Sequence, residues 1–168
     1  PKIDAQEAWD ITTGSSSVII ASIDTDFDIT HPDLANKINP SYDPITLITH
    51  SATGTSHGTN TISYAGAQNN GGCQLASIGW NTRLIAYVID DPIAQAQHAS
   101  LVMGADVITY SFSGGGPPDD NDMAAVKEIL DNGTVIVRSA GNFQYNNDDD
   151  RRPFAHQYDE RIIIVTST

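Results

Sequence analysis

The sequence predicts an α/β fold: an open, mainly parallel β-sheet with helices on both of its faces. First, short β-branched runs alternate along the chain with segments of helical pattern, as in strands joined by crossover helices. Second, the runs at residues 18–21, 135–137 and 162–165 are apolar at every position, not at every second one. Continuous apolar runs are typical of strands that are buried on both faces of a parallel sheet.

Each element follows from its local pattern. The predicted strands are residues 18–23, 84–89, 106–112, 134–138 and 161–166. The predicted helices are residues 5–10, 57–67, 93–103 and 123–131. Pro92 suits the first turn of the third helix, and Gly104 suits its end. Asp122 is the expected N-cap of the fourth helix, which Asn132 and Gly133 end.

Length and composition indicate one globular domain, which we place over residues 1–168. An apolar content of 39% argues against disorder. No apolar run reaches the ~18 residues of a membrane helix, so no membrane partner is expected. Eight basic and 21 acidic residues give a net charge of −13, which repels phosphate backbones and disfavours nucleic acid as a partner. The single cysteine, Cys73, excludes a disulfide within the chain.

Polar residues that can take part in a reaction stand where predicted strands end or predicted helices begin. Asp24 ends the first strand, His57 opens a helix directly before Gly58, and Asn142 follows the fourth strand. In an open parallel sheet, such groups gather at the carboxyl edge of the strands. An aspartate that orients a histidine base, with an amide that donates to an oxyanion, suggests acyl-transfer chemistry. Taken singly, each residue more often has a non-catalytic explanation. Asp24 suits a turn or cap, His57 a structural or solvated helix start, and Asn142 an ordinary Gly-Asn turn.

Several segments, in matching order, resemble blocks of the subtilisin-like serine protease (subtilase) family. Residues 8–14, 18–24 and 31–34 resemble the acid block, and residues 57–59 resemble the histidine block. Residues 76–81 resemble the turn after it, residues 104–108 and 111–114 the substrate-binding strand, and residues 139–142 the oxyanion block. The resemblance implies the N-terminal and central part of a peptidase domain. Its fold would be a subtilisin-like three-layer sandwich that is incomplete at the C-terminus.

The resemblance also implies roles for individual residues. Asp24 would be the acid of an Asp-His-Ser triad, His57 its general base and Asn142 the oxyanion donor. An extended peptide or protein substrate would pair with the strand segment that follows the third strand. That segment consists of Ser111, Phe112, Ser113 and Gly114.

No cofactor is implied for the chemistry, but a structural calcium ion is. Asp33 matches a calcium-ligating position of some family members, and Asn70 lies in the loop that resembles its partner. Loop carbonyls and a carboxylate can supply several of the six to eight oxygens that calcium takes, although an ordinary turn explains the same residues. The resemblance further implies an extracellular or secreted protein.

The sequence departs from the family pattern at three places. Asp26 stands where the acid block usually has glycine: either its side chain points to solvent, or its charge disfavours the ionised form of Asp24 and so disturbs the pairing with His57. Residues 90–92 lead almost directly into a helix, where the family has a longer excursion. No Gly-Thr-Ser-Met-Ala-like serine motif follows Asn142, and Ser56 adjoins the histidine too closely to serve as its nucleophile. The chain alone is therefore expected to be inactive.

Three interpretations follow. The chain is part of a subtilisin-like serine endopeptidase, or a non-catalytic peptide-binding or scaffold domain of the same fold, or an unrelated nucleotide-binding domain. The third is disfavoured because residues 114–116 lack the G-x-G-x-x-G spacing. A truncated sheet would also expose apolar surface, which favours pairing with a missing C-terminal part or self-association.

Overall fold

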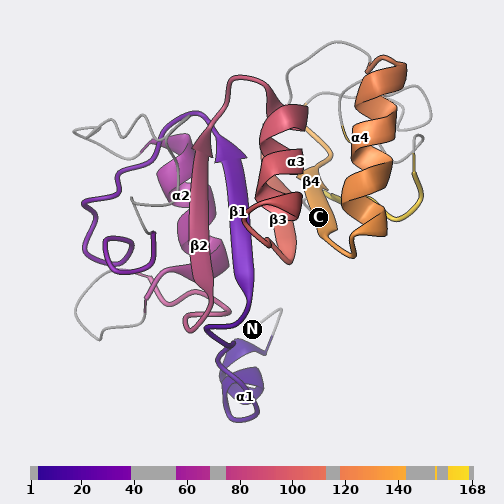
Figure 1. Cartoon of the computed structure of the whole chain (residues 1–168). Helices are drawn as coiled ribbons and strands as arrows, with labels where there is room; N and C mark the ends of the chain where they lie inside the picture. The colour runs from indigo at the N-terminus through magenta and orange to yellow at the C-terminus, as the bar shows by residue number, and fades with distance from the viewer. Residues whose placement is uncertain are drawn as a thin grey trace.

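The computed structural model describes residues 4–38, 56–68, 75–112, 118–142, 154 and 159–166. Its centre is a parallel sheet (Figure 1). The strands are β1 (Ile19–Asp24), β2 (Arg83–Val88), β3 (Val107–Tyr110), β4 (Val135–Ser139) and β5 (Ile163–Val165). The helices are α1 (Ala5–Trp9), α2 (His57–Gly66), α3 (Pro92–Leu101) and α4 (Asp120–Asp131). None of the helices within these ranges is long and apolar enough to cross a bilayer.

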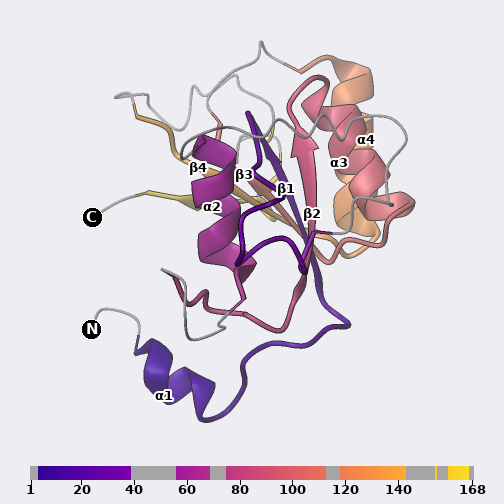
Figure 2. The same ribbon diagram turned by 90° about the vertical axis from the view of Figure 1, so that its left-hand side faces the viewer.

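The strand order is β2-β1-β3-β4-β5, and every neighbouring pair is parallel. In register, Ile23 of β1 lies between Tyr87 of β2 and Tyr110 of β3, and Tyr110 lies beside Arg138 of β4. Figure 2 shows three layers, with α2 on one side of the sheet and α3 and α4 on the other. The predicted α/β fold is thus confirmed.

Side-chain alternation along the strands builds a separate core on each face. On one face, residues such as Ile23, Ile108 and Ile136 pack with Ala96 of α3 and Ile129 of α4. On the other face, Leu84 and Ala86 pack with Ile62 of α2. Because both faces of β1 and β2 are covered, these strands are apolar at nearly every position.

The short helix α1 buries none of its residues. Trp9 attaches it, because its Nε1 donates to the carbonyl of Ile78 at 3.0 Å and its ring stacks on Trp80 with centroids 4.9 Å apart. The turn at residues 76–81 therefore joins α1 to the start of β2.

Most predicted bounds differ from the observed ones by one to three residues. Asp24 is the last residue of β1, and β3 ends at Tyr110, two residues before the predicted end. The expected cap of α4 was wrong: Asp119 is the N-cap, and Asp122 sits at the third helical position. The carboxylate of Asp119 accepts from the main-chain nitrogen of Asp122, and the carboxylate of Asp122 accepts from the main-chain nitrogen of Asp119. The two aspartates thus form a capping box.

Candidate active site

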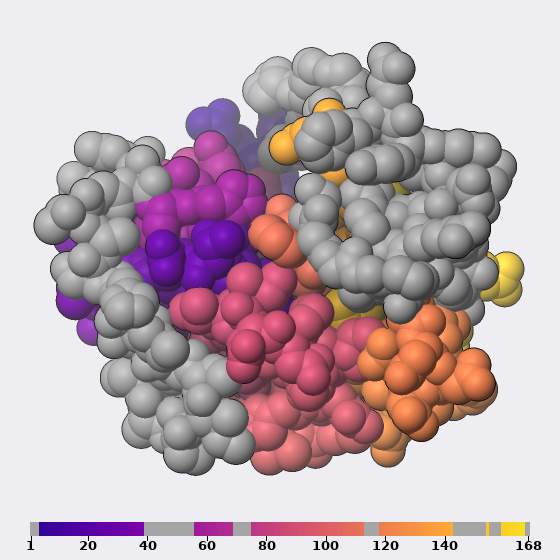
Figure 3. Space-filling view, turned by 90° about the horizontal axis from the view of Figure 1, so that it is seen from above, coloured from indigo at the N-terminus to yellow at the C-terminus, as the bar shows by residue number. Residues whose placement is uncertain are grey.

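Asp24 and His57 meet at the carboxyl edge of the sheet. Asp24 ends β1 with a fully buried side chain, and His57 is the first residue of α2. Nδ1 of His57 lies 2.6 Å from Oδ1 of Asp24. Figure 3, which looks onto this edge, shows α2 in magenta beside the darker segment that follows β1. The contact is present although Asp26 stands two residues after Asp24.

Further hydrogen bonds hold the carboxylate of Asp24. Oδ1 accepts from the main-chain nitrogen of Thr25 at 2.7 Å, and Oδ2 accepts from Oγ1 of Thr61 at 3.0 Å. Because both oxygens act as acceptors, the carboxylate cannot rotate freely, and the His57 ring bonded to it is oriented. Thr61 lies one helical turn after His57, and sequence reasoning missed it. Its i, i+4 spacing on the strand-facing side of α2 is the signal that could have revealed it.

The N-terminus of α2 fits tightly against the end of β1. Ser56 is its N-cap, and Oγ of Ser56 also bonds the carbonyl of Asp26 at 2.8 Å. Gly58 allows the close approach, since a Cβ there would lie 2.3 Å from that carbonyl oxygen and 3.1 Å from Cβ of Asp24. Asp26 thus contributes its main chain to the site, and the hydroxyl of Ser56 is used to cap the helix.

Asn142 follows β4 at the same edge of the sheet as Asp24. It comes after Gly141, whose φ of +86° is in the left-handed region and turns the chain away from the strand. Since β3 lies between β1 and β4, the two strand ends are about 10 Å apart, which is two strand spacings. Asn142 is exposed.

The predicted peptide-binding segment begins directly after β3. Ser111 and Phe112 are half-buried, and the Phe112 ring meets Tyr110 edge to face with centroids 6.2 Å apart. Ser113 and Gly114 lie outside the described residues. Ser111 and Phe112 therefore stand at the carboxyl edge, between the strand that ends in Asp24 and the strand that leads to Asn142.

The arrangement of Asp24 and His57 allows the histidine to act as a base. A carboxylate only accepts hydrogen bonds, so the Nδ1–H of His57 donates to Asp24; in the neutral form of the ring the lone pair is then on Nε2. The His57 side chain is 56% exposed, so a reactant can approach the ring from outside. Nε2 is thus available to take a proton from a hydroxyl group.

Asp33 is the residue best suited to hold a metal ion. Its side chain is 1% exposed, and within the described part of the chain neither carboxylate oxygen has a hydrogen-bond partner. An unpaired buried carboxylate is costly, and a cation removes that cost. The carbonyl of Asp33 accepts from Gln68, which leads into the loop that contains Asn70. Asn70 itself lies outside the described residues. The described ranges contain no cluster of three or more His, Cys, Asp or Glu side chains for a metal, so the further ligands would be carbonyls or loop residues.

Arg138 is a second residue that the sequence did not single out. It belongs to β4, is 1% exposed, and donates from Nε to the carbonyl of Ser139 at 2.9 Å. Its guanidinium group is therefore drawn toward the end of β4 that leads to Asn142.

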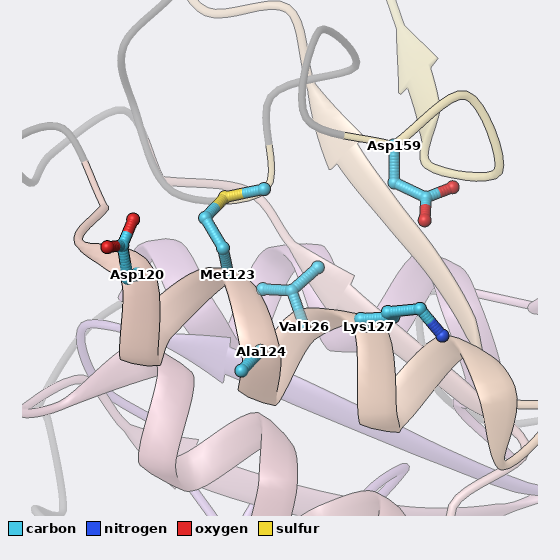
Figure 4. Close-up of a pocket in the computed structure, with 6 residues that line it drawn as sticks. All are labelled: Asp120, Met123, Ala124, Val126, Lys127 and Asp159. Carbon is cyan, nitrogen blue, oxygen red and sulfur yellow. The ribbon is translucent and has the colours of Figure 1, made fainter.

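A pocket of about 360 Å³ opens beside α4 (Figure 4). Its lining residues are Asp120, Met123, Ala124, Val126, Lys127 and Asp159. The pocket shares no residue with the Asp24–His57 pair. Among its two carboxylates and one lysine, no base is held in place by a hydrogen bond from another lining residue.

Comparison with known proteins identifies the family. A family model described as "Subtilase family" matches residues 15–168. This chain belongs to the subtilase family.

Two curated subtilase relatives are similar over most of the chain. The Thermophilic serine proteinase of Bacillus sp. (strain AK1) is 32% identical over an alignment of 152 residues, and the match covers 80% of this chain and 35% of that protein. Thermitase of Thermoactinomyces vulgaris is 32% identical over an alignment of 149 residues, and the match covers 84% of this chain and 53% of that protein. This chain therefore spans between a third and about half of these relatives.

A solved protease structure has the same fold. It is a protease from Pseudoalteromonas arctica, which matches with a TM-score of 0.67 and 28% identity. The match covers 83% of this chain and 54% of that one.

Proposed function

We propose that this chain provides the acid, the general base and the oxyanion donor of a subtilisin-like serine endopeptidase. The 2.6 Å contact between His57 and the buried carboxylate of Asp24 carries the proposal. In this role Asp24 fixes the ring, Nε2 of His57 takes the proton of an attacking serine hydroxyl, and the amide of Asn142 donates to the developing oxyanion.

The substrate we propose is a peptide or protein bound in extended form. Ser111 and Phe112, with Ser113 and Gly114 after them, would add the peptide as a strand beside the carboxyl edge. Family membership supports this substrate class, and it also supports our proposal of a secreted, extracellular protein.

We further propose that the chain alone does not hydrolyse peptides. No serine motif follows Asn142, and the hydroxyl of Ser56 bonds the carbonyl of Asp26 and Oγ1 of Thr59. The second function we consider is peptide binding without cleavage, for which the half-buried Ser111 and Phe112 at the carboxyl edge would suffice.

An intact mass spectrum before and after treatment with a fluorophosphonate tests these proposals. The 18.0 kDa chain is expected to remain unlabelled. Label on the 18.0 kDa species would contradict the proposed inactivity and would start a search for the nucleophile at Ser56. Binding of unlabelled chain to immobilised extended peptides, with loss of binding in Phe112→Ala, would favour the peptide-binding function. A longer labelled species from the same source would favour the peptidase.

We also propose that calcium binds at Asp33. The ion would stabilise the fold and take no part in the reaction. Its support is the buried, unpartnered carboxylate of Asp33.

A further inference from the structure

The pocket beside α4 has the size and the shape of a site for a small organic ligand. Its volume of about 360 Å³ lies in the range of about 300–1,000 Å³ that is typical of ligand pockets. The lining residues at positions 120, 123, 124 and 127 follow one another at helical spacing, so they form one stripe along α4. Asp159 lines the pocket from the segment that precedes β5 (Figure 4). The pocket therefore extends along the helix.

The middle of the pocket is apolar. Met123 and Val126 project from α4 into the space between its two ends, where Asp120 and Asp159 lie (Figure 4). Val126 is 2% exposed and belongs to the core, so it forms a fixed floor. Met123 is half-buried, and its flexible, polarisable side chain can adapt to the shape of a ligand. A ligand that fills the pocket therefore needs an apolar body.

The two ends of the pocket differ in charge. At one end, the carboxylate of Asp120 is exposed and forms no ion pair with any residue that the structure describes. At the other end, Asp159 pairs with Arg161, and Lys127 pairs with Asp131, so each of these charges already has a partner of opposite sign. Among the charged residues that line the pocket, Asp120 is therefore the one that can pair with a charge on a ligand, and that charge is positive.

We propose that this pocket binds an aliphatic organic cation of the class of a lysine or arginine side chain. The ammonium or guanidinium group would pair with Asp120, and the carbon chain would lie on Met123 and Val126. Asp120 and Lys127 are seven residues apart, which is about 10 Å along a helix, so a chain of about five carbons fits between them. The net charge of −13 also favours the approach of cations. The site does not depend on the proposed peptidase function, because it shares no residue with the Asp24–His57 pair.

The NMR signals of the methionine methyl groups in the 168-residue chain test the proposal. The chain has two methionines: Met123 lies in the pocket, and Met103 packs against the core, so it serves as an internal reference. We expect pentylammonium to shift the Met123 signal saturably and to leave the Met103 signal unchanged. Both 1-pentanol, which lacks the charge, and methylammonium, which lacks the chain, should bind more weakly. For methylammonium the loss should reach up to about fourfold for each methylene group that the pocket covers.

Replacing the proposed partner of the cation gives a matched comparison. Asp120→Asn should weaken the binding of pentylammonium by about two- to fivefold, as is typical of an exposed ion pair, and should leave the binding of 1-pentanol unchanged. The variant is expected to fold, since Asp120 is exposed and the N-cap of α4 is Asp119. Glu7→Gln removes an exposed carboxylate of α1 and controls for the change in net charge, so it should bind pentylammonium as the wild type does.

A tripeptide amide with a central lysine, compared with its norleucine analogue, identifies the source of the cation. A Met123 shift with the lysine peptide but not with the norleucine peptide would support the site and assign it to a peptide side chain. A shift with pentylammonium but with neither peptide would support the site and assign it to a free amine.

Three results would overturn the proposal. The first is a Met123 signal that does not respond to pentylammonium, or that moves only together with the Met103 signal. The second is equal affinity for pentylammonium and 1-pentanol, since an apolar cavity alone would then explain the binding. The third is an unchanged affinity for pentylammonium in Asp120→Asn, or an equal loss in Glu7→Gln.

Discussion

The His57 ring is positioned by the contacts that hold the carboxylate of Asp24 and the start of α2. Thr25 and Thr61 bond the two oxygens of Asp24, and Gly58 lets α2 approach the end of β1. A reacting pair needs a fixed geometry, and here main-chain contacts and short polar side chains provide it.

Replacing Gly58 tests the close approach of α2 to the end of β1. Gly58→Ala should destabilise the protein by about 1–3 kcal/mol, because the new Cβ would meet the carbonyl of Asp26, which belongs to the main chain and yields little. Urea denaturation measures the effect. Asn60→Ala, at an exposed position of the same helical turn, should change the stability by less than about 0.5 kcal/mol. An alanine at position 58 that stabilises the protein, as helix propensity alone would predict, would contradict the close approach.

Among the secondary-structure elements, the ends of α4 show how local polar contacts fix a helix. At its N-terminus, Oδ1 of Asp119 accepts from the main-chain nitrogens of Asn121 and Asp122 at 2.8 and 2.9 Å. Near its C-terminus, Asp131 accepts hydrogen bonds from Lys127 and from Arg161, which directly precedes the strand region of β5. The helix is therefore fixed at one end by its own cap and at the other by a neighbouring strand segment.

The cap assignment yields a paired prediction. Asp119→Ala should cost about 1 kcal/mol of stability, because two main-chain donors lose their acceptor. Asp122→Ala should cost less, since its side chain accepts only from the nitrogen of Asp119. Thermal unfolding of both variants checks the order of the two effects. A larger loss of stability in Asp122→Ala than in Asp119→Ala would support Asp122 as the N-cap, as the sequence suggested.

The ion pairs at the other end predict a pH dependence. Hydrogen bonds from Arg161 hold the pKa of Asp159 below its usual value of 3.8, and those from Lys127 and then Arg161 do the same for the pKa of Asp131. Carboxylates with a lowered folded-state pKa add stability above pH 3.8, and this stability is lost as the pH falls through the folded-state value.

Arg161→Gln should therefore lower the midpoint of thermal unfolding at about pH 6 to 7, and the difference from the wild type should vanish in strong acid. The measurement is thermal unfolding followed by circular dichroism, from about pH 7 down to strong acid. Arg83→Gln removes an exposed arginine that forms no ion pair with any described residue, and so controls for the change in net charge. A difference that persists unchanged into strong acid would show that Arg161 acts through packing.

At the scale of the whole molecule, the sheet places distant segments together. The strand order puts β1 inside the described sheet, with β2 on one side and β3, β4 and β5 on the other. Residues 24 and 57 are brought into contact, and Asn142 reaches the same edge. On the side of the sheet that carries α2, no helix among the described residues covers β3, β4 and β5.

Calcium binding is predicted to act on the stability of the entire fold. Saturating calcium should raise the wild-type unfolding midpoint, since a ligand at about 100 times its dissociation constant adds about 2.7 kcal/mol. Asp33→Asn should remove the rise and, without calcium, should leave the stability equal or higher, because a buried charge without partners is gone.

Differential scanning calorimetry with calcium or with a chelator measures both effects. Asp28→Asn is the control, because Asp28 accepts from Thr30 in a local turn that asparagine can retain. A calcium shift of the same size in Asp33→Asn would place the ion elsewhere, and the lack of any shift in the wild type would contradict the site.

The sequence by itself determined the fold class, the family and the identity of Asp24 and His57 as a pair. The apolar runs and helix signals are local patterns, and they reported the parallel sheet because strands buried on both faces must be apolar throughout. The element bounds were less accurate, because side-chain caps such as Asp119 compete with equally plausible neighbours such as Asp122.

Only the tertiary structure decided which contacts the site residues make. The bond from Thr61 to Asp24, the approach of Gly58 to the carbonyl of Asp26 and the lack of partners for Asp33 all depend on packing between segments far apart in the chain. The burial of Arg138 and the exposure of Val135 are decided in the same way, since alternation gives a strand two faces but does not say which of them is covered.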